Sequence, residues 1–127
     1  MDNSIRILLV DDETIFTKNI SKLLKNRGYQ VAAVNDGYSA IRELEKNPFD
    51  IMILDLKMPG MDGITALAQT IKRCFFTETL ILTGHGSIDS ALEAMKMGAY
   101  DYLTKPCEIE ELVLKIEAVT AENKRAG

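Results

Sequence analysis

Five short apolar runs, separated by segments of helical periodicity, constrain the fold of this chain more than any other feature. The runs typical of buried strands are 5–10, 30–34, 51–54, 79–83 and 100–104. Short turns rich in Gly, Pro, Asn and Asp connect them to the helical segments. Strict alternation of strand and helix predicts an α/β fold, a doubly wound parallel sheet of five strands with helices on both faces.

Apolar residues recur at helical spacing after each run. They mark the faces of five helices at Phe16, Ile20, Leu23 and Leu24; at Ile41 and Leu44; at Ile64, Leu67, Ala68 and Ile71; at Ile88, Ala91, Leu92 and Met95; and at Ile109, Leu112, Val113, Ile116 and Val119. Asp62 and Ser87 are placed to cap the third and fourth helices, and Gly28 and Gly98 to end the first and fourth. The last helix is expected to fray in the polar tail 122–127.

Length and composition predict one compact domain over residues 1–127, with a core of about 5–121. The chain has 127 residues, of which 46% are hydrophobic, and its net charge is −4 with 15 basic residues scattered along it. We therefore expect a cytoplasmic domain that contacts neither nucleic acid nor membrane. Cys74 and Cys107 match no metal or disulfide pattern and are interpreted as packing residues.

Polar residues stand where four of the strands end. Asp11 and Asp12 follow the first strand, Asp55 the third, Thr83 the fourth and Lys105 the fifth. The carboxyl ends of parallel strands open on one edge of the sheet, so we expect these five side chains to converge there. Glu13, which follows the acidic pair, is expected instead to favour the start of the first helix.

Such a group has a defined chemistry. Three carboxylates offer the hard oxygen ligands that Mg²⁺ prefers, and the ion usually also takes water and phosphate oxygens. Thr83 and Lys105 supply donors for the oxygens of a phosphoryl group. One carboxylate remains as a nucleophile, and Asp55 on the middle strand is the best placed to form an aspartyl-phosphate.

The sequence resembles the receiver domains of two-component response regulators over residues 5–121. The resemblance depends on motifs in the family's order and spacing, namely Asp11-Asp12, Leu54-Asp55, the segment 58–63 (Met-Pro-Gly-Met-Asp-Gly), Thr83, Gly98-Ala99 and Lys105-Pro106. It implies a flavodoxin-like (βα)5 fold with strand order 2-1-3-4-5 and a cis Lys-Pro bond. The chain looks similar to receivers of transcriptional activators and of hybrid kinases.

The resemblance also implies roles for the strand-end residues. Asp55 would accept a phosphoryl group from the phosphohistidine of a histidine kinase or phosphotransfer domain, Thr83 would hydrogen-bond that group, and Lys105 would pair with it. Mg²⁺ would be held by three carboxylates and one main-chain carbonyl, those of Asp11, Asp12, Asp55 and Lys57. Such a domain is not a classical enzyme, since it catalyses only its own phosphorylation and autodephosphorylation.

Further positions match the family's switching and rate-tuning residues. Tyr102 matches the aromatic switch that acts with Thr83, turning from a solvent-facing to a buried position. The surface of the fourth helix, fifth strand and fifth helix, including Ala91, Met95 and Tyr102, would then become the partner or dimer face that controls an output domain. The positions of Lys57, whose side chain is expected to be solvated, and of His85 would tune the phosphoryl lifetime.

Two alternatives remain open at this point. A magnesium-dependent phosphohydrolase of the haloacid dehalogenase group shares the aspartyl nucleophile, but it needs a second aspartate where this chain has Lys57, and it needs a cap domain. A degenerate receiver that acts only as an interaction module is the other alternative. All acidic, hydroxyl and lysine positions of the motif are intact, which argues against it.

Overall fold

The computed structural model describes residues 5–57, 62–73, 76–84 and 88–126, the last five of these as backbone only. Strands and helices alternate along it. In chain order they are β1 (Arg6–Val10), α1 (Thr14–Asn26), β2 (Gln30–Val34), α2 (Gly37–Lys46), β3 (Ile51–Leu54), α3 (Gly63–Lys72), β4 (Glu78–Thr83), α4 (Ile88–Met97), β5 (Asp101–Thr104) and α5 (Ile109–Ala126). The predicted strand bounds are correct to within one residue.

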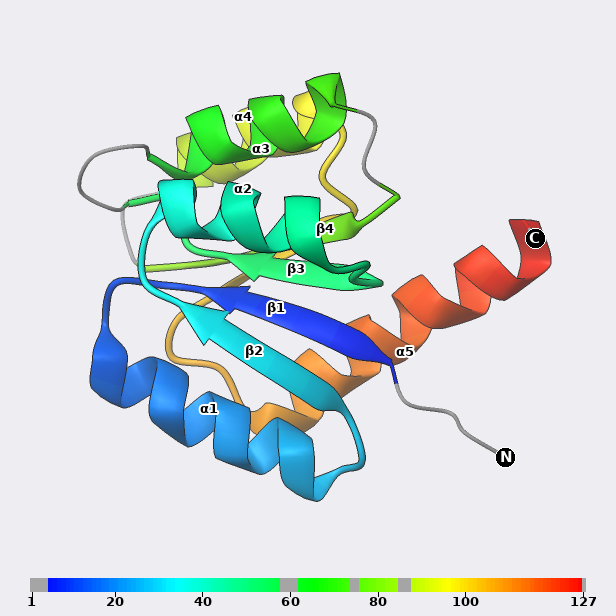
Figure 1. Ribbon diagram of the computed structural model, residues 1–127. Helices are drawn as coiled ribbons and strands as arrows, with labels where there is room; N and C mark the ends of the chain where they lie inside the picture. Colours follow the sequence, from blue (N-terminus) through cyan, green and yellow to red (C-terminus); the bar gives the residue numbers. More distant parts are fainter. Residues whose placement is uncertain (1–4, 58–61, 74–75, 85–87, 127) are drawn as a thin grey trace.

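The five strands form one parallel sheet in the order β2-β1-β3-β4-β5, which confirms the predicted fold. Helices α1 and α5 cover one face of the sheet, and α2, α3 and α4 cover the other (Figure 1). Strand β3 therefore lies in the middle of a three-layered molecule. No helix among the described residues is long and apolar enough to cross a membrane.

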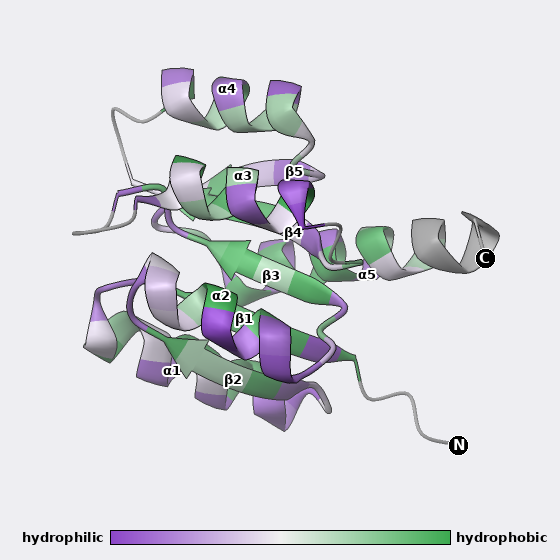
Figure 2. Ribbon diagram, turned by 45° about the horizontal axis from the view of Figure 1, so that its top comes forward, coloured by the Kyte–Doolittle hydropathy of each residue, from purple (hydrophilic) through white to green (hydrophobic). Residues whose placement is uncertain are grey.

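Strand β3 shows why a short apolar run suffices for a central strand. All four of its residues are buried, and they alternate between two hydrophobic clusters. Met52 and Leu54 face the α2, α3 and α4 side, and Ile51 and Ile53 face the α1 and α5 side. A strand covered on both faces needs apolar residues at every position, and Figure 2 shows β3 as largely hydrophobic along its length.

Helix ends follow the predicted capping residues where they are described. The Asp62 carboxylate accepts a hydrogen bond from the Thr65 N–H at 2.8 Å and so caps α3. Gly28 and Gly98 follow α1 and α4 with φ angles of 96° and 123°, a conformation that favours glycine. Ser87, predicted to cap α4, lies outside the described residues.

Some predicted helix faces were wrong in α1, α3 and α4. Large apolar residues expected inward are exposed, namely Leu23, Ile71, Ile88 and Leu92, and Ala68 is exposed too. In α4 the fully buried residues are Ala91 and Ala94. In α3 the buried residues are Gly63, Ala66, Leu67 and Thr70, so the buried faces of α3 and α4 consist mostly of small side chains.

Two further expectations concern the tail and the cysteines. The backbone of the polar tail is helical as far as Ala126, where α5 ends. Cys107 packs against the cluster on the α5 side, as predicted, and its burial raises the pKa of the thiol. Cys74 lies outside the described residues.

Candidate functional site

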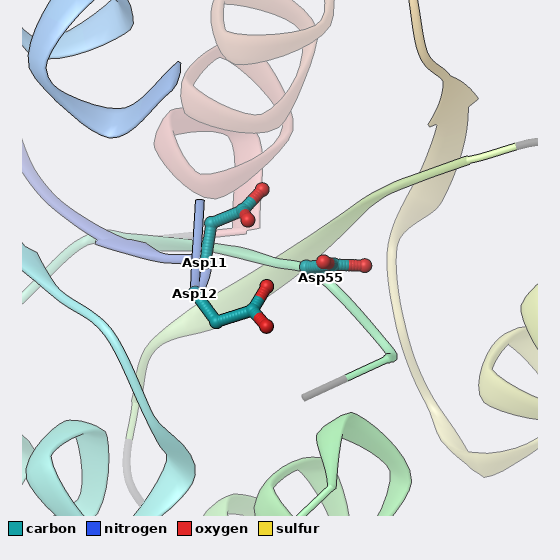
Figure 3. A group of neighbouring side chains, drawn as sticks. All are labelled: Asp11, Asp12 and Asp55. Carbon is teal, nitrogen blue, oxygen red and sulfur yellow. The ribbon is translucent and has the colours of Figure 1, made fainter. Parts of the chain in front are cut away.

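The carboxyl ends of four strands bring the predicted residues together. Val10 at the end of β1 pairs with Leu54 at the end of β3, so the acidic residues that follow each strand become neighbours. One carboxylate oxygen from each of Asp11, Asp12 and Asp55 lies within 4.8 Å of the others. Figure 3 shows the three side chains side by side at the ends of β1 and β3.

Asp55 is buried and its carboxylate is fixed in orientation. Its Oδ1 accepts a hydrogen bond from the Lys57 N–H at 3.2 Å and another from the Thr83 hydroxyl at 3.3 Å. Its own N–H donates to the carbonyl of Val10 at 2.9 Å, which ties it to β1. Only 6% of Asp55 is exposed. A carboxylate held in this way is already positioned for attack in one direction.

Asp11 and Asp12 differ in their surroundings. Asp11 is buried, and its Oδ1 accepts a hydrogen bond from the Glu13 N–H at 3.0 Å. Burial raises the pKa of the Asp11 carboxyl, and the nearby charge of Asp55 adds to the rise, while hydrogen bonds from Lys105 and Glu13 oppose it. Asp12 is exposed to solvent.

Lys105 reaches over the end of β1 to the first turn of α1. Its Nζ lies 2.6 Å from Asp11 Oδ2, 2.6 Å from Glu13 Oε1 and 3.7 Å from Asp55 Oδ2. The same nitrogen lies 4.4 Å from the centre of the Phe16 ring. Burial alone would lower the pKa of Lys105, but the hydrogen bonds to Asp11 and Glu13 outweigh it and raise the pKa. The side chain is therefore a permanent cation at neutral pH.

Glu13 and Phe16 are the residues near the site that sequence reasoning missed. Glu13 occupies the cap position of α1, but its side chain makes no capping hydrogen bond and pairs with Lys105. The sequence did hold a signal for this pair. Glu13 is a third acid after Asp11 and Asp12, and Lys105 is the one lysine that directly follows a strand. Phe16 packs against the core as expected, and nothing in the sequence indicated that its ring also faces a cation.

Gly63, the first residue of α3, packs directly on the main chain that follows β3. Its N–H donates to the carbonyl of Leu56 at 3.0 Å, and a Cβ built on it would clash with backbone atoms of Asp55 and Leu56. Gly84, after β4, is different, because a Cβ there would meet nothing within 4 Å. The main chain after β3 is thus tightly packed against the start of α3, whereas the residue after β4 has free space beside it.

The predicted switching and tuning residues differ in how far they are exposed. Ala91, predicted to belong to the partner face, is fully buried and lies on the side of α4 that packs on the sheet, so it offers no surface to a partner in this structure. Met95 and Tyr102 are half-buried and pack against the same cluster, so the Tyr102 ring is not simply solvent-facing. Lys57 is exposed as expected, and His85 lies outside the described residues.

The chemistry of the acidic group fits a small, hard divalent cation. It offers three carboxylate oxygens from short, well-fixed segments, and one of the three residues, Asp12, is open to water. Mg²⁺ binds through a few carboxylates and keeps several waters, which this half-open arrangement permits. The Lys105-Pro106 peptide bond beside the site is cis, as predicted.

The family model described as "Response regulator receiver domain" matches residues 7–117. Among curated relatives, the alginate biosynthesis transcriptional regulatory protein AlgB of Pseudomonas aeruginosa is 34% identical over 135 residues, which cover 96% of this chain and 30% of AlgB. The transcriptional regulatory protein ZraR of Escherichia coli (strain K12) is 35% identical over 119 residues, which cover 94% of this chain and 27% of ZraR. The chain therefore spans less than a third of either relative.

Solved structures agree with this match over the whole length of the chain. A response regulator receiver domain protein from Clostridium thermocellum superposes with a TM-score of 0.91 at 34% identity, covering 97% of this chain and 99% of that one. A CheY-like receiver domain protein from Methanospirillum hungatei JF-1 gives a TM-score of 0.92 at 26% identity, covering 98% and 100%.

Proposed function

Because this chain belongs to the response regulator receiver domain family, we propose that Asp55 accepts a phosphoryl group from the phosphohistidine of a sensor histidine kinase or phosphotransfer domain. The observation that carries the proposal is the setting of Asp55. Its carboxylate is buried, held by the Lys57 N–H and Thr83, and surrounded by the other strand-end groups. An acid that served only as a turn residue would need neither the burial nor these hydrogen bonds.

The proposed transfer forms a bond between an Asp55 carboxylate oxygen and phosphorus while the P–N bond of the phosphohistidine breaks. The electron pair of that bond stays on the imidazole nitrogen of the donor. The domain supplies orientation of the nucleophile and charge stabilisation of the transferred oxygens, through Thr83 as hydrogen-bond donor and Lys105 as cation. The chemistry is limited to its own phosphorylation and dephosphorylation.

Mg²⁺ is the proposed cofactor. The residues that would hold it are Asp11, Asp12 and Asp55 through their carboxylates and Lys57 through its main-chain carbonyl. When bound, the ion supplies positive charge that offsets the repulsion between the carboxylates and the phosphoryl oxygens. Without it, the three acids repel one another and any incoming anion, and Lys105 is the only cationic side chain at the described strand ends that offsets this.

The proposed output is a change in the surface formed by α4, β5 and α5. Thr83 would move toward the new phosphoryl oxygens, and the half-buried Tyr102 ring would turn further inward. Met95 borders this surface and would change its exposure with it. The named relatives are transcriptional regulators, so we infer that a transcriptional output domain or a second copy of the domain is the partner of this face. Lys57 and His85 are proposed to tune the phosphoryl lifetime by controlling access of water.

The test is labelling with a small phosphodonor in the presence of Mg²⁺, followed by intact-mass measurement. Wild type should gain one acid-stable, base-labile phosphoryl group, and Asp55→Asn should gain none. Asp89→Asn removes an exposed acid on α4 and serves as the matched control, which should label like wild type. Labelling that persists in Asp55→Asn, or that maps to His85, contradicts the assignment. A wild-type protein that never labels favours the interaction-module alternative.

A further inference from the structure

The Lys105 ammonium lies closer to a residue at the start of α1 than to the proposed acceptor. Its Nζ is closer to Glu13 Oε1, at 2.6 Å, than to Asp55 Oδ2, at 3.7 Å. The face of the Phe16 ring lies 4.4 Å below the same nitrogen, within the range of a cation–π interaction. Two residues of the first turns of α1 therefore hold a cation that the proposed chemistry needs at Asp55.

The main chain of Lys105 is anchored independently of its side chain. Its N–H donates to the carbonyl of Thr83 at 2.8 Å, so the residue is anchored beside the end of β4. The ammonium can therefore move between α1 and Asp55 by rotation of its own side chain, without displacing β5. The long, flexible stem of lysine permits this.

Asp11 cannot be the main restraint on Lys105 once a cation is bound. Its Oδ2 contacts Lys105 at 2.6 Å, but the same carboxylate belongs to the proposed metal ligands. A metal ion would compete with Lys105 for that carboxylate and weaken the pair. Glu13 and Phe16 are outside the group of three carboxylates, so their hold on Lys105 would remain.

We propose that Glu13 and Phe16 are positioning residues that form a resting site for the Lys105 ammonium and so bias the domain toward its unphosphorylated state. This rests on the proposed function of Asp55. Glu13 is 62% exposed, so its ion pair is weak and easily released. A dianionic phosphoryl group on Asp55 is a stronger partner than either, and Lys105 transfers to it. The balance between the two positions sets how readily the phosphorylated form is reached.

The resting site is tested first in the protein without metal or phosphodonor. A ring face directly below an ammonium shifts the neighbouring Lys105 Hε protons upfield in an NMR spectrum. We expect that shift in wild type and in Phe16→Tyr, which keeps the ring, and its loss in Phe16→Leu, which keeps only the apolar bulk. The Hε protons of the exposed Lys46 and Lys96 provide the reference in the same spectrum. Lys105 protons at the reference position in wild type overturn the proposal.

The bias is tested by the affinity for beryllofluoride, a phosphoryl analogue, at saturating Mg²⁺. Glu13→Asp keeps the charge but shortens the reach, and Phe16→Leu removes the ring. Each should raise the apparent affinity about two- to fivefold, the range expected for one exposed ion pair or cation–π contact, and Phe16→Tyr should match wild type. Unchanged or weaker binding in both variants overturns the bias. If no variant binds beryllofluoride, the function of Asp55 fails, while the NMR result still decides whether the resting site exists.

Discussion

The hydroxyl of Thr83 lies 3.3 Å from Asp55 Oδ1, and this long hydrogen bond joins the carboxyl ends of β4 and β3 inside the protein. Both side chains are buried. Hydroxyl donors usually approach their acceptors to about 2.7–2.8 Å, so this contact has room to shorten or to be exchanged for a better one. A charged phosphoryl oxygen on Asp55 would be a better acceptor, and the Thr83 hydroxyl lies close enough to donate a hydrogen bond to it.

Thr83→Ala should separate phosphorylation from signalling. The variant keeps Asp55 and the acidic group, so it should still bind beryllofluoride, but it lacks the hydroxyl that pulls the end of β4. Amide chemical shifts should then change only near Asp55 and no longer at Tyr102 or in α4, and any phosphorylation-dependent dimer seen by sedimentation should be lost. Thr83→Ser keeps the hydroxyl and is the control. Wild-type shifts at Tyr102 in Thr83→Ala would show that the signal takes another route.

Mg²⁺ should stabilise the fold through the acidic group. A ligand that binds only the native state adds about 2.7 kcal/mol at roughly one hundred times its dissociation constant. Removing one of three mutually repelling carboxylates should stabilise the native state in the absence of metal, so Asp12→Asn should melt above wild type without Mg²⁺. Because a metal ligand is gone, the variant should also lose most of the rise in melting temperature that Mg²⁺ causes. Thermal melts with and without millimolar Mg²⁺ measure both effects. An unchanged Mg²⁺ response in Asp12→Asn would place the ion elsewhere, and Asp89→Asn should respond like wild type.

Gly63→Ala and Gly84→Ala make a matched pair, since each adds one methyl group next to the site, one at the start of α3 and the other after β4. The Cβ of Gly63→Ala would clash with the main chain of Asp55 and Leu56, so we expect a loss of about 1–3 kcal/mol in unfolding free energy. Gly84→Ala meets open space and should be neutral or more stable by roughly 0.4–1 kcal/mol, since it restricts the unfolded chain. Urea unfolding measures the difference. Equal unfolding free energies for the two variants would mean that the start of α3 shifts to accommodate the added methyl group at little cost.

Asp36 should contribute a stability that depends on pH. Its carboxylate caps α2, accepting a hydrogen bond from the Ser39 N–H at 2.7 Å, and that bond is the main reason why the pKa of Asp36 is lowered from 3.8. Since the folded pKa lies below the unfolded one, the added stability is present above about pH 3.8 and is lost as the pH falls through the folded pKa. Asp36→Ala should therefore cost about 1 kcal/mol near neutral pH and less in acid.

Urea unfolding of wild type and Asp36→Ala at about pH 7 and about pH 3 checks this expectation. Asp36→Asn is the control, because an amide can cap the helix without titrating. A difference between wild type and Asp36→Ala that stays constant with pH would mean that the ionised carboxylate does not make the cap.

The strands and the strand-end residues were predictable because both follow from one local rule. A central strand such as β3, buried at every position, shows as an uninterrupted apolar run, and the residue after any strand of a parallel sheet stands at one common edge. The pairing of Val10 with Leu54 then brings Asp11 to Asp55 without further information. Neither the strands nor their end residues depend on how the helices pack.

Features that depend on packing between distant elements were not predictable in this way. The periodicity of α4 identified an apolar stripe, but its neighbour decides which part of the stripe is covered, and small Ala94 is buried while Leu92 is exposed. Likewise, Glu13 and Lys105 are 92 residues apart in the sequence. Each has a local explanation that is sufficient by itself, so only the three-dimensional structure shows that they pair.

The contrast between Gly63 and Gly84 gives the site a mechanical direction. On one side, the first turn of α3 is wedged against the peptide groups that follow Asp55 and leaves no space for the acceptor strand to shift. On the other side, a Cβ at Gly84, directly after β4, would meet nothing within 4 Å. Any force that arises at Asp55 would be resisted on the first side and yielded to on the second. A displacement that starts at Asp55 is therefore expected at the end of β4, where Gly84 has free space, and not at the start of α3.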